Sequence, residues 1–233
     1  MRIEVAWAKA AKGGLGRSGD SIELVERPLG GMTLVLSDGQ GSGPAARRIS
    51  SMVAMKAVSL LSDGSRDGAV ARAVQDMLYT AREGRVTATL VLLSADLHTG
   101  TLVIARNTPM PVIVRQASRV FRVDGASEVI GTYRTTRPTI TELPLVPETI
   151  LLTYSDGVAH GGRRYGKTIN WEDWDKRLAT VSLNDLGDFV DQLLDEVLTL
   201  DKGRPSDDVS VMALGVRDGD GTTIRRLRAS APY

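Results

Sequence analysis

The order of its apolar patterns constrains the fold of this chain more than any other feature. Two stretches with helical spacing of apolar residues, 49–61 and 70–81, follow one another directly. A long run of short apolar segments, linked by turn-forming residues, comes next. A doubly wound parallel sheet would need helices that alternate with strands, and these patterns do not alternate. The sequence therefore predicts an α+β layered domain with mainly antiparallel sheets.

The expected strands are short, and a third helix lies near the end of the chain. Strands are expected over 32–37, 86–95, 101–106, 111–115, 120–123, 139–145, 149–154, 209–216 and 223–227. The last helix is expected to start at Ser182, because Asp185 follows three residues later as in a capping box. No linker or repeat interrupts the 233 residues, so 1–233 is expected to form a single domain.

Composition excludes several classes of function. The chain has no cysteine, which removes thiolate nucleophiles and cysteine zinc sites and is typical of a reducing compartment. Its 29 basic and 28 acidic residues, with 4% aromatic residues, argue against a nucleic-acid partner. No apolar run approaches the roughly 18 residues of a membrane helix, and the N-terminus lacks a secretory signal. A soluble, cytoplasmic protein without a membrane partner is expected.

Motifs for several common chemistries are absent. The sequence has no P-loop, no glycine-rich dinucleotide loop after a strand and no nucleophile elbow. Its two histidines, His98 and His160, have no neighbouring nucleophile pattern. Both are therefore expected to be surface residues.

Aspartates at three strand ends give the best indication of a functional site. Asp38 and Asp156 each follow an expected strand and precede a glycine, and Asp207 lies just before the strand at 209–216. One such aspartate is most often part of a turn, but three in one chain favour a shared site. Clustered carboxylates raise one another's pKa unless a cation neutralises them. Ligand sets made only of oxygen favour Mg²⁺ or Mn²⁺ over zinc.

Four short motifs occur in an order that resembles a known family. They are Ser18-Gly19-Asp20, the DGQGSG run at 38–43, Ser155-Asp156-Gly157-Val158 and Asp207-Asp208-Val209-Ser210. In this order they resemble the metal-dependent protein phosphatases (the PPM family), and the form DGxGSG resembles its bacterial SpoIIE-like branch. The resemblance spans nearly the whole chain and is greatest to short, stand-alone stressosome phosphatases.

The resemblance implies a fold and a metal site. The fold would be an αββα sandwich, with two antiparallel sheets between helices and the metals at one edge between the sheets. The cofactor would be Mn²⁺ or Mg²⁺, as two ions. Asp38 would bridge both ions, the Gly39 carbonyl would bind one, and Asp156 and Asp207 would hold the other. Asp20 matches a family position that acts through a metal-bound water.

The resemblance also implies a reaction. A metal-activated water would hydrolyse phosphoserine or phosphothreonine on a protein, without a covalent intermediate. The substrates would be STAS-domain proteins of a stressosome or partner-switching pathway. Gln40 stands where eukaryotic relatives have histidine, and an amide cannot protonate the leaving oxygen.

Other details stay open at the level of the sequence. Asp208 is expected to support the site rather than to bind an ion, and no residue is singled out as the phosphate-binding cation among Lys9, Lys12 and Arg17. Two alternatives to a protein phosphatase remain. One is a phosphoprotein-binding module without activity, and the other is a hydrolase of small phosphate monoesters.

Overall fold

Two five-stranded sheets face each other in the computed structural model, which describes residues 1–13, 15–219, 221, 224–227 and 229–230. The first sheet has the order β1 (Arg2–Ala10), β10 (Val209–Arg217), β9 (Thr149–Tyr154), β6 (Val112–Gln116) and β7 (Arg119–Val123). The second has the order β2 (Ser21–Glu26), β3 (Gly31–Ser37), β4 (Leu90–Asp96), β5 (Thr101–Asn107) and β8 (Thr139–Pro144). All eight strand pairings are antiparallel.

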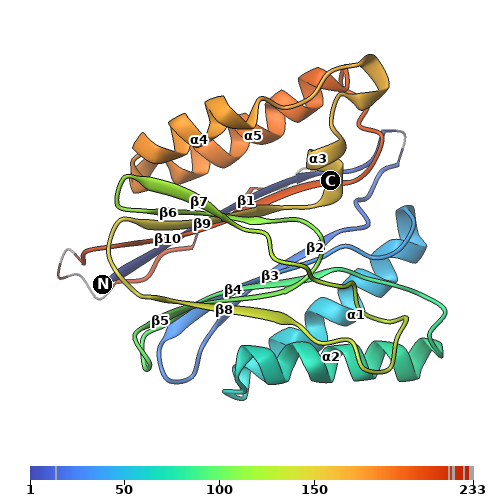
Figure 1. Ribbon diagram of the computed structural model, residues 1–233, viewed down its shortest axis with the longest axis horizontal. Helices are drawn as coiled ribbons and strands as arrows, with labels where there is room; N and C mark the ends of the chain where they lie inside the picture. The colour runs from blue at the N-terminus through green and yellow to red at the C-terminus, as the bar shows by residue number, and fades with distance from the viewer. Residues whose placement is uncertain (14, 220, 222–223, 228, 231–233) are drawn as a thin grey trace.

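Helices cover the outer face of each sheet (Figure 1). α1 (Gly43–Ser62) and α2 (Asp67–Arg82) lie on the second sheet, and α4 (Trp171–Thr180) and α5 (Leu186–Leu200) lie on the first. A short α3 (Asp156–His160) follows β9, and single 3-10 turns occupy Arg163–Tyr165 and Leu183–Asp185. The expected αββα sandwich is confirmed. Among helices formed by the described residues, none has both the length and the apolar character needed to cross a bilayer.

The core consists of three apolar layers. Buried side chains of α5, such as Val190 and Leu193, pack on the outer face of the first sheet. Val53 and Val74 of α1 and α2 pack on the outer face of the second sheet. A middle layer, which includes Leu93, fills the space between the sheets. Each sheet is therefore buried on both faces, which explains why strands such as β9 are buried throughout.

Besides the short α3 and the 3-10 turns, three elements were not predicted from the sequence. β1 is an edge strand whose residues are mostly half-buried, and its pattern is correspondingly weak. β2 carries polar residues at several positions. In α4 only Trp174 and Leu178 are fully buried, so its apolar stripe is too narrow to recognise.

Other predicted boundaries need correction. The strand expected over 86–95 begins only at Leu90, because Ala88 instead makes isolated bridges to Gly39 and Ile130. Ala81, expected on the apolar face of α2, is exposed. The Ser182 hydroxyl accepts a hydrogen bond from Asn184 N and caps a 3-10 turn, so α5 starts only at Leu186. Of the strand expected over 223–227, position 223 lies outside the described residues, and 224–227 form no strand.

Candidate functional site

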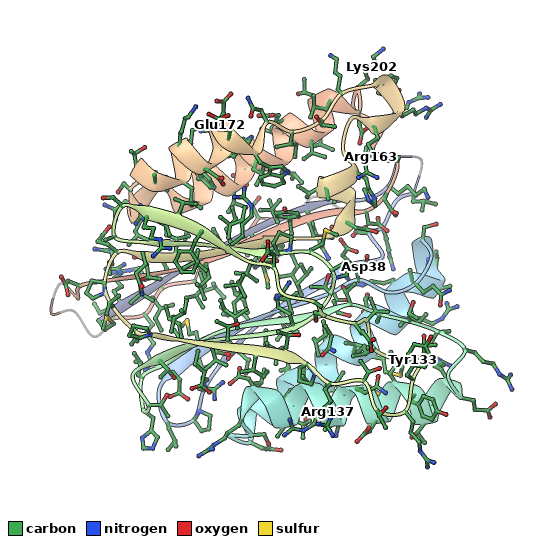
Figure 2. All side chains as sticks on the ribbon, in the orientation of Figure 1. Asp38, Tyr133, Arg137, Arg163, Glu172 and Lys202 are labelled. Carbon is green, nitrogen blue, oxygen red and sulfur yellow. The ribbon has the colours of Figure 1, made fainter. Side chains whose placement is uncertain are left out.

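The strand registers place acidic residues in two pairs at strand ends. In the second sheet Ser21 pairs with Ser37, so Asp20 and Asp38 lie just beyond this last rung. In the first sheet β9 ends at Tyr154 and β10 begins at Val209, so the segments carrying Asp156 and Asp207 emerge side by side. Figure 2 shows Asp38 at the edge of the sandwich, between the two sheets.

The electrostatics of Asp38 show that the two pairs share one site. Burial raises the pKa of Asp38 to about 9, and the negative charges of Asp20, Asp156 and Asp207 act in the same direction. Burial also raises the pKa of Asp156, and the charge of Asp207 adds to this rise. The fold therefore gathers four carboxylates whose charges repel one another.

Asp20 is the most deeply buried of the four. It is fully buried, and neither carboxylate oxygen has a hydrogen-bond partner among the described residues. Burial raises the pKa of Asp20 to about 6. The Ser210 and Ser155 hydroxyls lie close enough to offset part of the rise, but neither makes a hydrogen bond of good geometry to it. A buried carboxylate without partners is costly unless a positive charge is supplied.

The turn that carries Asp38 is fastened to the segment 87–89. Asp38 N donates to the Thr89 hydroxyl at 3.1 Å, and Thr89 N donates to the Asp38 carbonyl at 2.8 Å. Gln40 N donates to the Thr87 carbonyl at 3.0 Å, and Thr87 N donates to Gln40 Oε1 at 2.9 Å. The turn is thus held on a fixed backbone, as a precise site requires.

Ser155 fastens the Asp156 turn to the start of β10. Its hydroxyl donates to the Asp208 carbonyl at 3.2 Å and accepts from Ser210 N at 2.9 Å. Ser155 N also donates to the Ser210 carbonyl at 2.9 Å. These three bonds keep Asp156 beside Asp207.

Two glycines allow backbone segments of the site to approach one another closely. A Cβ at Gly39 would collide with the Ala46 carbonyl, because the first turns of α1 pack against the Asp38 turn. A Cβ at Gly157 would collide with the Asp208 carbonyl. The glycine after each aspartate is therefore needed for packing between the loops of the site.

Cationic groups border the site beside Asp20. Lys9 Nζ donates to the Asp20 carbonyl at 3.2 Å, and Arg47 Nη1 donates to the same oxygen. Burial, and then the charge of Arg47, lower the pKa of Lys9. Lys12 contributes its backbone N, which donates to Asp208 Oδ1 at 2.9 Å, and the Arg17 side chain is exposed.

Four residues that contact the site were not predicted from the sequence, namely Arg47, Thr89, Ser155 and Ser210. Arg47 lies one turn into the helix that follows the DGQGSG run, and this position is the signal that could have identified it. Ser155 and Ser210 both lie within the quoted motifs. The hydroxyl of Thr89 is recognisable only from the structure, because residues 38 and 89 are far apart in the sequence.

The two histidines differ in their surroundings. His98 is exposed in the turn between β4 and β5, as expected. His160 is half-buried at the end of α3, and its charge lowers the pKa of Asp156. Partial exposure is compatible with the expected surface position, and the structure adds an electrostatic effect of His160 on Asp156.

The donor groups at the site fit a hard divalent cation. The described residues contain no group of three or more His, Cys, Asp or Glu side chains already gathered at the spacing that holds a metal. The charges of Asp20, Asp156 and Asp207 nevertheless add to the effect of burial in raising the pKa of Asp38, and both oxygens of Asp20 lack partners among the described residues. Oxygen ligands of this kind suit Mg²⁺ or Mn²⁺.

A cavity of about 240 Å³ opens over these carboxylates. Asp38, Gly39, Asp156 and Asp207 line one part of it, together with Gln40. Threonine hydroxyls and apolar side chains line the rest. The site is therefore accessible to a small group that carries negative charge, provided that cations are present.

Comparisons with known proteins identify the family of the chain. A family profile described as "Stage II sporulation protein E (SpoIIE)" matches residues 28–217. A protein named "Stage II sporulation protein E" from Priestia megaterium is 25% identical over 211 residues, which are 90% of this chain and 36% of that protein. The chain thus spans about a third of the length of this curated relative.

Solved structures show the same fold. The PP2C phosphatase domain of SpoIIE from Bacillus subtilis, with a fragment of its regulatory domain, matches with a TM-score of 0.76 at 23% identity, covering 93% of this chain and 64% of that one. The serine/threonine phosphatase Stp1 from Staphylococcus aureus matches with a TM-score of 0.75 at 15% identity, covering 94% and 96%. A chain solved in work on the bacterial stressosome matches with a TM-score of 0.67 at 20% identity, covering 92% and 100%.

The family profile covers most of the chain, and the matched phosphatase structures share its fold. The resemblance noted in the sequence is thereby confirmed. The chain belongs to the SpoIIE family and has the PP2C-type phosphatase fold.

Proposed function

We propose that this chain is a metal-dependent protein-serine/threonine phosphatase, with 1–233 as a single phosphatase domain. The observation that carries the proposal is the meeting of Asp20, Asp38, Asp156 and Asp207 at one edge of the sandwich, where burial and then the charges of the other three raise the pKa of Asp38 to about 9. Such a cluster is costly as a structural element and becomes favourable when it binds cations.

The ligands would be Asp38, the Gly39 carbonyl, Asp156 and Asp207, and they would hold two Mn²⁺ or Mg²⁺ ions. Asp20 lies behind Asp38 and would act through a water. When bound, the ions would offset the charge of the phosphoryl oxygens and lower the pKa of a water, which makes phosphoester hydrolysis possible near neutral pH. Family membership supports this assignment.

The residues of the chain itself have positioning roles. Thr89 holds the Asp38 turn, and Ser155 holds the Asp156 turn against β10. Gln40 has no acidic proton, and its side-chain oxygen is occupied by Thr87 N. The proton for the leaving serine or threonine oxygen would therefore come from water in the open cavity.

The proposed substrates are phosphorylated STAS-domain proteins of a stressosome or partner-switching pathway. The fold shared with a chain solved in work on the bacterial stressosome supports this choice. A cytoplasmic location is proposed, with no nucleic-acid or membrane partner. The balance of 29 basic and 28 acidic residues and the absence of cysteine support it.

Phosphate release tests the proposal. The protein is incubated with a phosphoserine STAS domain and with p-nitrophenyl phosphate, in Mn²⁺ or in EDTA. Release from the protein substrate in Mn²⁺ only, lost in Asp38→Asn, is the expected result. Asp185→Asn is the matched control, because Asp185 is exposed near the start of α5, away from the cavity.

Two other results would contradict the proposal and support a different function. Binding of the phosphoprotein without release in any metal would indicate a non-catalytic module. Release from p-nitrophenyl phosphate alone would indicate a hydrolase of small phosphate monoesters.

A further inference from the structure

The cavity over the carboxylates has a second, apolar part. Leu36 and Val91 are buried there, with exposed fractions of 2% and 1%. Met110 and Val129, both half-buried, complete this region, which we call the apolar pocket. Leu36 and Val91 belong to the core layer between the sheets, so the apolar pocket is the open end of that core.

Buried polar side chains fix the backbone of this pocket on the Met110 side. Arg106 is 1% exposed, and it donates from Nη1 to the Met110 carbonyl at 2.8 Å and from Nη2 to the Gly125 carbonyl at 2.5 Å. Asn107, also 1% exposed, donates to the Glu128 carbonyl at 3.0 Å. These bonds hold the loops on both sides of the pocket in place, so its shape exists before a ligand arrives.

Val129 is anchored to the same segment that holds the carboxylates. Its neighbour Ile130 exchanges two backbone hydrogen bonds with Ala88, at 2.9 and 3.0 Å. Ala88 lies within the segment 87–89 that fastens the Asp38 turn. The apolar pocket therefore has a fixed position relative to the carboxylates.

Small-molecule pockets usually measure about 300–1,000 Å³. At about 240 Å³, this cavity has room for a phosphoryl group and one further side chain. Cations bound by the carboxylates would fix the phosphoryl group. The side chain that fills the apolar pocket must therefore belong to a residue close to the phosphorylated one in the same substrate molecule. Since consecutive Cα atoms are about 3.8 Å apart, only near neighbours of the phosphorylated residue can reach it.

We propose that the apolar pocket is a specificity subsite, which receives an apolar side chain within two positions of the phosphorylated serine or threonine of a protein substrate. This inference rests on the proposed function. An apolar side chain gains free energy when it leaves water, whereas an amide or charged group would lose its hydrogen bonds to water there. Met110 and Val129 are the residues that would determine specificity.

Pairs of phosphoserine peptides test the inference. Each pair differs only by leucine or asparagine at position −2, −1, +1 or +2, so size and charge are matched. In Mn²⁺, kcat/KM is expected to favour leucine about tenfold at one of these positions. The ratio is expected to approach one in Val129→Thr or Met110→Gln, which change polarity with little change in size. Val146→Thr is the control, because Val146 lies half-buried beyond β8 and does not line the cavity.

Two outcomes would overturn the inference while leaving the proposed function intact. One is phosphate release from every peptide with less than a twofold preference at all four positions. The other is a leucine preference that survives in both Val129→Thr and Met110→Gln. If neither a peptide nor the phosphorylated STAS domain releases phosphate in Mn²⁺, the proposed function fails. Peptide affinity, measured by fluorescence anisotropy in Mn²⁺, then still tests the pocket, because a preference for leucine supports it and equal affinity refutes it.

Discussion

Asp38 should make the metal-free protein less stable as the pH rises. Its pKa is raised from 3.8 to about 9 in the folded state, mainly by burial and by the neighbouring carboxylates. Between these values the folded protein keeps a proton that the unfolded chain releases. The free energy of unfolding therefore falls with increasing pH, by about 1.4 kcal/mol per pH unit for one such proton.

The expected loss of stability with increasing pH is large enough to measure. From pH 6 to pH 8 the slope corresponds to a loss of about 3 kcal/mol, or roughly 5–10 °C in Tm for a domain of this size. Asparagine at position 38 cannot ionise, so the loss should be much smaller in Asp38→Asn. Mn²⁺ should remove most of the loss in the parent protein, because metal binding displaces the proton.

Thermal and urea unfolding in EDTA at pH 6, 7 and 8 would check this reasoning. The exposed Asp185→Asn variant controls for the removal of a carboxylate elsewhere and should keep the slope of the parent protein. An equal slope in the parent protein and in Asp38→Asn would refute the assignment of the buried proton to Asp38. A free energy of unfolding that rises between pH 6 and pH 8 would contradict the predicted direction of the pH dependence.

Three further predictions concern the packing of the site and of the core between the sheets. Gly157→Ala should place a methyl group against the Asp208 carbonyl, and calorimetry should show weaker Mn²⁺ binding. Ser155→Ala removes the bonds to Asp208 and Ser210, so denaturant unfolding should show a loss of about 1–3 kcal/mol and calorimetry about tenfold weaker Mn²⁺ binding. Leu93→Ala, in the layer between the sheets, should cost about 2–5 kcal/mol in denaturant unfolding, and unchanged Mn²⁺ affinity is the expected calorimetric result.

The fold could be predicted in outline because most strands are buried on both faces. β9 is buried throughout, with a central apolar run, and was expected over the residues that form it. The paired helices α1 and α2 were expected from their apolar spacing, since each buries a broad face on the second sheet. β1, β2 and α4 escaped prediction, because edge strands and thinly buried helices have only weak apolar patterns.

For the candidate site, the sequence by itself determined which aspartates stand at strand ends and which glycines follow them. Only the tertiary structure decided that Asp20 lies beyond the rung formed by Ser21 and Ser37, that Arg47 turns toward the Asp20 carbonyl, and that Thr89 holds the Asp38 turn. The physical reason is that strand register and the packing of the two sheets bring together residues that are far apart in the chain. The spacing of residues in a sequence reflects only the local backbone conformation. The repulsion among these carboxylates arises only when the folded sheets bring them together.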